Sequence, residues 1–318
     1  MEFRKLISFG KTSFVMSIPK SWVTKNNLKK GDLIALEEEK GDLILSPNVE
    51  QKKNKKKTTK IDITGIDRTS VLYVIRSAYK MGCDEIELIY NKPLAKHYRK
   101  DKEEKIISII HEEVNRLVGI EVVQQKDNFC IIRDLSENSA AEFDSALRRV
   151  FLLLNDASND LKQAVKDRDN VLLDTIEEKH NSITKFVSYC LRLINKGKFK
   201  DPQKSMTLYH IISNLDKITD ILKYSARDIR EQGNKLKKES RDIIEKINES
   251  IITYYELFYK FDFSKSSKLY EDRDDIIKDI SVMSKKLPGN ELLILEKAEA
   301  ILELITDLSE ARMAMEHN

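Results

Sequence analysis

From residue 137 to residue 318 the chain holds only five glycines and prolines, at positions 197, 202, 233, 288 and 289. Both residue types are unfavourable inside helices, so this distribution predicts long helices with short breaks. Charged residues make up 34% of the chain and hydrophobic residues 41%, which is typical of amphipathic helices. We expect six helices packed as antiparallel bundles, over residues 139–167, 169–196, 203–232, 236–261, 264–285 and 290–316.

Two of these helices carry the same acidic motif. Residues 216–220 and 303–307 both have the order acid-x-Ile-Thr-Asp, which indicates two copies of a three-helix unit. The i,i+4 spacing places Asp216 with Asp220, and Glu303 with Asp307, on one helix face, where like charges repel by roughly a few tenths of a kcal/mol. A shared cation would explain why this unfavourable pair occurs twice.

Further acids stand on the second and fifth of these helices, namely Glu178, close to Asn181, and the pair Glu271 and Asp274. Carboxylates from facing helices bind hard or borderline cations. In a chain with 53 acidic residues, however, such pairs also arise by chance. A metal site and ordinary exposed acids therefore both stay open. Because the sequence offers no nucleophile–base pair and no complete set of metal ligands, we expect no enzymatic activity.

Residues 1–47 have a different pattern, with short β-branched and apolar segments around turn residues. Gly10 with Lys11, and Gly41 with its neighbours, mark hairpin turns, and Pro19 opens a short helical turn. We therefore expect a small all-β domain. A unit of fewer than about 50 residues hardly buries a core alone, so we expect it to dimerise.

Residues 48–60 contain six lysines and predict a basic linker. Residues 61–135 then alternate between strand and helix patterns in the order βαβαββ, which predicts an α+β sandwich module with helices on one face. This module has no Gly-rich phosphate loop. A spacer, a dimerisation module and a small-molecule sensor all remain open.

The charge is unevenly distributed along the chain. Residues 1–60 hold 14 Lys and Arg against 7 Asp and Glu, whereas residues 61–318 hold 42 against 46. The basic N-terminal part favours an anionic partner, although a solvated basic face would have the same composition. No run of 18 apolar residues occurs, so we expect no membrane span. The three scattered cysteines, together with an N-terminus that lacks a signal peptide, favour a cytoplasmic protein.

Two segments resemble known families. The motifs FVMSIPKSWV (14–23), NLKKGDLIAL (27–36) and GDLILSP (41–47) are similar to the AbrB/SpoVT swapped-hairpin DNA-binding domain. This resemblance implies an interleaved homodimer that presents basic loops to a roughly palindromic DNA site. The DNA-contacting residues that it implies are Arg4, Lys5, Lys11, Ser13, Lys20 and Lys25.

The helical half resembles PhoU, a phosphate-signalling protein of two tandem three-helix bundles. The motifs that carry this resemblance are NLDKITDILKYSARDI (214–229) and LELITDLSEARMAM (302–315). It implies bundles over residues 137–233 and 234–318 that bind a divalent or iron-type cation. The implied ligands are Glu178, Asp216, Asp220, Glu271, Asp274, Glu303 and Asp307. Asn181 replaces an aspartate of the family, which weakens metal binding in the first bundle.

The domain order resembles that of archaeal PhoU-like regulators of phosphate uptake. It implies a multidomain transcriptional regulator whose helical half senses phosphate status and shifts DNA affinity. The alternative is an adaptor that controls a phosphate transporter ATPase or a signalling kinase by protein contact, with the N-terminal domain only dimerising.

Overall fold

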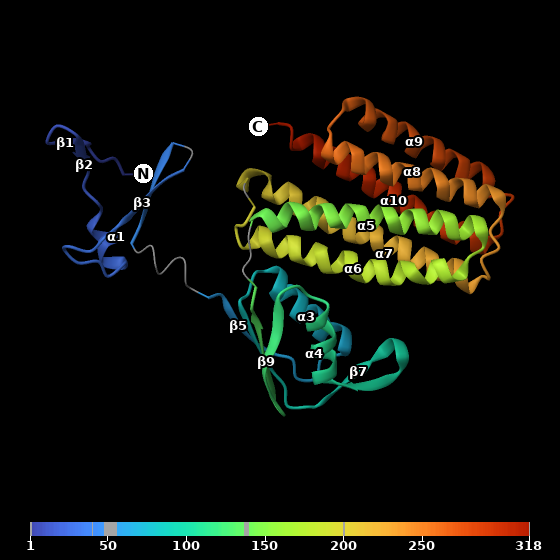
Figure 1. The fold of residues 1–318 in the computed structure, drawn as a ribbon, viewed down its shortest axis with the longest axis horizontal. Coiled ribbons are helices and arrows are strands. Elements are labelled where there is room, and N and C mark those ends of the chain that lie inside the picture. The colour runs from blue at the N-terminus through green and yellow to red at the C-terminus, as the bar shows by residue number, and fades with distance from the viewer. Residues whose placement is uncertain (1, 40, 48–55, 137–139, 200, 318) are drawn as a thin grey trace. The chain divides into compact units, whose positions relative to one another are not determined.

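The computed structural model describes residues 2–39, 41–47, 56–136, 140–199 and 201–317. The chain divides into two compact units, Met1–Lys56 and Lys57–Asn318. Figure 1 colours the chain from blue at the N-terminus to red at the C-terminus, so the first unit is blue. Residues 48–55 of the predicted basic linker lie outside the described residues. The β-rich N-terminal region and the mostly helical C-terminal half confirm the predicted multidomain layout in general terms.

The first unit consists of two antiparallel hairpins and one short helix. Strand β1 (Ile7–Phe9) pairs with β2 (Ser13–Val15), and β3 (Ala35–Glu39) pairs with β4 (Asp42–Ser46). Helix α1 (Lys20–Lys25) follows Pro19 and lies between the hairpins in sequence. Gly10 adopts a φ of +73° in the first turn, a conformation that glycine allows without strain.

The second unit begins with a four-stranded sheet in the order β5-β6-β10-β9. The strands are β5 (Thr58–Asp62), β6 (Glu85–Ile89), β9 (Ile120–Lys126) and β10 (Phe129–Asp134), with helices α3 (Arg68–Lys80) and α4 (Ile106–Asn115) between them. Alternate residues of the central strands, such as Ile86, Leu88 and Cys130, are buried, as the period of two in a strand requires. Strand β5 begins inside the segment predicted as linker, because Thr58 and Thr59 favour a strand.

An additional hairpin interrupts the predicted βαβαββ order. Strands β7 (Leu94–His97) and β8 (Lys102–Lys105) pair around the 3-10 turn η1 (Tyr98–Lys100). The predicted βαβαββ order does not contain this hairpin. Four charged residues (Lys102, Glu103, Glu104 and Lys105) carry no apolar period, so only cross-strand pairing places them in β8.

The rest of the second unit is helical. The six helices are α5 (Ala140–Asp167), α6 (Asn170–Asn195), α7 (Ser205–Glu231), α8 (Lys238–Tyr259), α9 (Phe263–Met283) and α10 (Gly289–Ala314), with a 3-10 turn η2 (Pro202–Lys204) before α7. Their bounds lie within a few residues of the predicted ones. Caps explain several of these ends, since the carboxylate of Asp169 accepts from Val171 N–H and that of Asp262 from Ser264 N–H.

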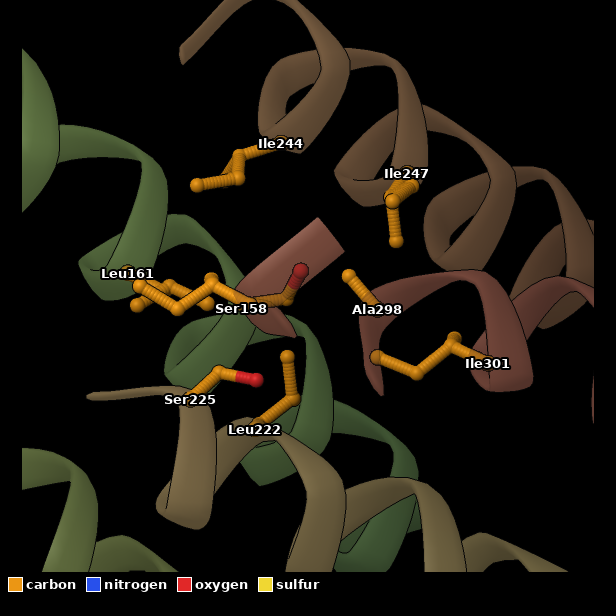
Figure 2. Close-up of a pocket in the computed structure, with 9 residues that line it drawn as sticks. Ser158, Leu161, Leu222, Ser225, Ile244, Ile247, Ala298 and Ile301 are labelled. Atoms are coloured by element: carbon orange, nitrogen blue, oxygen red, sulfur yellow. The ribbon is translucent and has the colours of Figure 1, made fainter. Parts of the chain in front are cut away.

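The two three-helix sets share one core. Helices α5, α6 and α7 pack together, as do α8, α9 and α10, and the sets meet through α5 with α8 and α7 with α10. At the centre a cavity of about 10 Å³ lies among Leu161, Leu222 and Ile301 (Figure 2). Ser158 and Ser225 also line it, and the Ser225 hydroxyl finds no partner among the described residues. A cavity of this size is at the lower limit for holding one water molecule.

A buried ion-pair cluster joins the α+β module to the bundle. The guanidinium of Arg192 on α6 is fully buried and donates to the Tyr79 carbonyl at 2.8 Å and to Asp134 at 2.6 Å. Lys196, which directly follows α6, contacts Asp134 at 2.9 Å and Asp84 at 2.7 Å. Burial acts to raise the pKa of Asp134, but hydrogen bonds from Lys196, Ser136 and Arg192 hold it well below its usual range. The cluster fixes the module against α6.

Candidate functional site

The first unit exposes the apolar side chains that its sequence pattern assigns to a core. Exposed side chains include Phe3 (86%), Phe9 (70%), Phe14 (67%) and Leu33 (90%). Among the residues of this unit whose burial is described, Ser46 alone is buried. Large apolar side chains that are exposed on so small a unit are typical of a surface that another protein chain covers.

The implied DNA-contacting residues lie on the surface of this unit. All six are exposed: Arg4 and Lys5 before β1, Lys11 in the first turn, Ser13 in β2, and Lys20 and Lys25 at the two ends of α1. Arg4 donates to Glu2 at 2.7 Å, and both side chains are solvated. Exposed cations on short loops can contact phosphates.

A cleft of about 450 Å³ separates the α+β module from α6 and α7 in the second unit. Its module side is formed by α3, α4 and the β7–β8 hairpin, which projects from the module in Figure 1. Its bundle side is formed by α6 and α7, which supply His180, Asn181, Asp216 and Asp220. The i,i+4 acids Asp216 and Asp220 thus both face this cleft, as the spacing on one helix face requires.

These two acids have protein partners. Asp220 accepts from His180 Nε2 at 2.9 Å and from Lys223 Nζ at 2.7 Å, and Asp216 accepts from the Thr184 hydroxyl at 2.9 Å. Burial acts to raise the pKa of Asp220, but the hydrogen bonds from His180 and Lys223 lower it well below its ordinary value. Asp220 is therefore an ionised group held by the Lys223 ammonium and the His180 ring.

The remaining predicted metal ligands lie on exposed helix faces. Glu178, Glu271, Asp274, Glu303 and Asp307 are all exposed. Arg273 contacts Asp274 at 2.8 Å and Glu303 at 3.6 Å. Glu303 and Asp307 line an open groove between α7 and α10 together with Asp220.

Within the described part of the chain, no three His, Cys, Asp or Glu side chains gather closely enough to hold a metal ion. In the first bundle Asp220 already pairs with Lys223 and lies within hydrogen-bond distance of His180, so a cation would have to displace Lys223 from this carboxylate. The predicted divalent or iron-type cation thus stays a prediction.

The sequence did not predict the basic side of the cleft. Arg68 and Arg76 stand two turns apart on α3, Arg99 and Lys100 lie in η1, and Arg116 follows α4. The i,i+8 spacing of Arg68 and Arg76 can be read from the sequence. Arg99, Lys100 and Arg116 join them only because of the β7–β8 hairpin, which was not predicted, and the packing of the module on α6.

Comparison with known proteins finds a family model that matches the N-terminal segment. Residues 9–56 match a family model described as antidote-toxin recognition MazE, bacterial antitoxin. The match falls on the segment whose motifs resemble the AbrB/SpoVT domain, and it covers a small part of the chain. No curated protein matches the chain. No helix among the described residues is both long and apolar enough to cross a membrane.

Proposed function

We propose that this protein is a homodimeric, cytoplasmic DNA-binding regulator of transcription. The N-terminal unit binds DNA, and the helical half carries the signal that adjusts this binding. The protein performs no catalysis in this proposal.

The observation that carries the proposal is the exposure of large apolar side chains in residues 2–39 and 41–47. Phe9, Phe14 and Leu36 are more than half exposed in a single copy, and burying such groups contributes about 1.5–3 kcal/mol each. A second copy that interleaves its hairpins would cover them. The family match to residues 9–56 supports a domain of this type.

The charge of this unit supports DNA as the partner. A two-fold dimer would present two copies of Lys11, Lys20 and Lys25, all exposed, to a pseudo-symmetric duplex. Each lysine that contacts a phosphate would add about one unit to the salt dependence of binding.

The helical half supports a role in phosphate uptake through its resemblance to PhoU and its pair of three-helix sets. In this proposal it contacts a phosphate transporter ATPase or a signalling kinase and shifts the DNA affinity of the first unit. The exposed acids of α9 and α10, including Asp274 and Asp307, offer a surface for such a partner.

The test is binding of the full-length protein to its own upstream DNA, compared with a scrambled duplex of equal composition and titrated with salt. We expect preferential binding with a steep salt slope. Lys11→Glu should weaken binding roughly a hundredfold in a dimer, because two charges reverse. Lys278→Glu, an exposed lysine on α9, is the matched control and should leave binding nearly unchanged.

Equal binding to both duplexes would contradict the proposal and favour the adaptor function, in which the first unit only dimerises. The name of the matched family favours a further candidate, an antitoxin-type regulator that binds a toxin protein. Co-expression with the product of a neighbouring gene separates these functions: an antitoxin relieves growth arrest, whereas an adaptor does not.

A further inference from the structure

The cleft between the α+β module and the bundle carries positive charge that the protein does not neutralise. Several of its cations are paired: Arg68 with Glu112, and Arg227 with Glu177. Within the described residues, however, no carboxylate pairs with Arg99, Lys100 or Arg116. These three side chains line one concave volume of about 450 Å³, within the usual range for a small-molecule site.

The side chain that Arg116 contacts across the cleft is an uncharged amide and not a carboxylate. Arg116, following α4, donates to the amide oxygen of Asn181 on α6 at 2.8 Å. An aspartate at this position would accept the same hydrogen bond and cancel the charge of Arg116. Asn181 orients the guanidinium and leaves its charge available to a ligand.

Partly exposed aromatic rings border the same cleft. Tyr73 on α3 is 60% exposed and lies below the Arg76 guanidinium, with 5.7 Å to the ring centroid. Tyr224 on α7 is 38% exposed and has the Lys223 ammonium 4.4 Å from its centroid. A ring placed beside such tyrosines can stack on them while an attached anion reaches the cations.

Buried polar atoms complete the cleft. The side chain of His97, at the end of β7, is buried at its lining. The side chain of His180 also lines it, with Nε2 2.9 Å from Asp220 and 3.0 Å from Lys223 Nζ. Polar atoms at a concave surface orient a ligand, whereas solvated lysines on a flat surface do not.

We propose that this cleft binds a small phosphorylated molecule that carries a ring, of nucleotide or sugar-phosphate size. A phosphate monoester carries about −1.5 to −2 charges at neutral pH, enough to engage two or three cations at once. Arg116, Arg99 and Lys100 would contact the phosphate, and Tyr73 or Tyr224 would stack on the ring. The proposal does not depend on whether the first unit binds DNA.

The test is isothermal titration of the full-length protein with AMP, glucose 6-phosphate and inorganic phosphate. We expect AMP or glucose 6-phosphate to bind at least roughly tenfold more tightly than inorganic phosphate, because inorganic phosphate gains no ring contact. AMP binding well above that of glucose 6-phosphate would assign a nucleotide, and the reverse a sugar phosphate. Absence of binding by all three at about 5 mM would overturn the proposal.

Charge variants locate the site. Asn181→Asp keeps the hydrogen bond to Arg116 and should weaken binding roughly tenfold or more, because it neutralises the guanidinium. Asn170→Asp places the same charge on the exposed first residue of α6, about three turns away, and should change binding less than about twofold. Equal effects of both variants would overturn the assignment to the cleft.

A double variant tests the same site independently of Asn181. The double variant Arg99→Ala with Lys100→Ala changes only exposed side chains, so it should fold and still lose about tenfold in affinity for the small molecule. In the absence of the small molecule, it should bind a 20-base-pair duplex as tightly as the unaltered protein. A matching loss of duplex affinity would show that the cleft belongs to a DNA surface and would contradict the proposal.

Discussion

The two units of this chain place their apolar side chains in opposite ways. The first unit exposes Phe3, Phe9, Phe14 and Leu33, whereas the second buries a continuous core through its sheet and six helices. Length contributes to the difference, because a unit the size of Met1–Lys56 is marginal for enclosing a core of its own. In the proposed dimer the first unit depends on a second copy to cover these side chains, whereas the second unit has a core of its own.

A matched pair of phenylalanines tests this difference. Phe14 in β2 and Phe263 at the start of α9 are both 67% exposed in one copy. We expect Phe14→Ser to weaken dimerisation at least roughly a hundredfold, since two buried rings are lost and each contributes about 1.5–3 kcal/mol. Sedimentation equilibrium over a range of concentrations measures the change.

Phe263→Ser is the control. Its ring has an edge contact with Phe261, 5.0 Å between centroids, so its loss should cost below about 1.5 kcal/mol and leave dimerisation unchanged. If Phe14→Ser leaves the dimer intact, the exposed apolar surface of the first unit is not its interface.

The Arg192 cluster tests how firmly the second unit holds together. Arg192→Ala should lower the free energy of unfolding of this unit by about 3 kcal/mol, because a fully buried guanidinium that contacts Asp134 and the Tyr79 carbonyl is lost. Arg230→Ala removes an ion pair with Asp174 in which both side chains are about half exposed, and should cost less than about 1 kcal/mol. Urea unfolding followed by circular dichroism compares them. Equal losses would show that the module does not depend on this junction.

The sequence predicted the helical half well because its signals are local. Apolar residues recur with the helical period, and Gly197, Gly233 and Pro288 mark ends that the structure confirms. The β7–β8 hairpin was missed because Lys102–Lys105 has no apolar alternation. Its pairing partner, Leu94–His97, is specified by contacts across the strand rather than along the chain.

The cleft was less predictable than the elements that form it. The i,i+4 spacing correctly placed Asp216 and Asp220 on one face, and the i,i+3 spacing places Lys223 beside Asp220, but no spacing predicts that His180 meets Asp220. Lys223 is three residues away on the same helix, whereas His180 stands on α6. Arg116 meets Asn181 only because the module packs on α6, a contact between residues 65 positions apart.

The stability that the Asp134 ion pairs contribute should depend on pH. The pKa of Asp134 is lowered in the folded state, so its contribution to stability is full above the unfolded value near 3.8 and is lost as pH falls below it. Asp134→Asn should cost about 2 kcal/mol at pH 7 and flatten the loss of stability between about pH 4 and pH 2. Unfolding free energies across this range test it. Asp156→Asn, on the exposed face of α5, should keep the wild-type slope, and a wild-type slope in Asp134→Asn would contradict the assignment.

Removal of a helix cap should have the smallest effect on the unfolding free energy, and the two units differ in their caps. Helix α1 of the first unit follows Pro19 and has no side-chain cap, whereas the Asp169 carboxylate caps α6 through Val171 and Leu172 N–H at 2.8 and 3.0 Å. Asp169→Ala should therefore cost about 1 kcal/mol of unfolding free energy. Asp156→Ala, inside α5, removes the same carboxylate without a cap and should change stability by less than about 0.5 kcal/mol, since alanine favours helix. Equal effects would mean that the start of α6 does not depend on this cap.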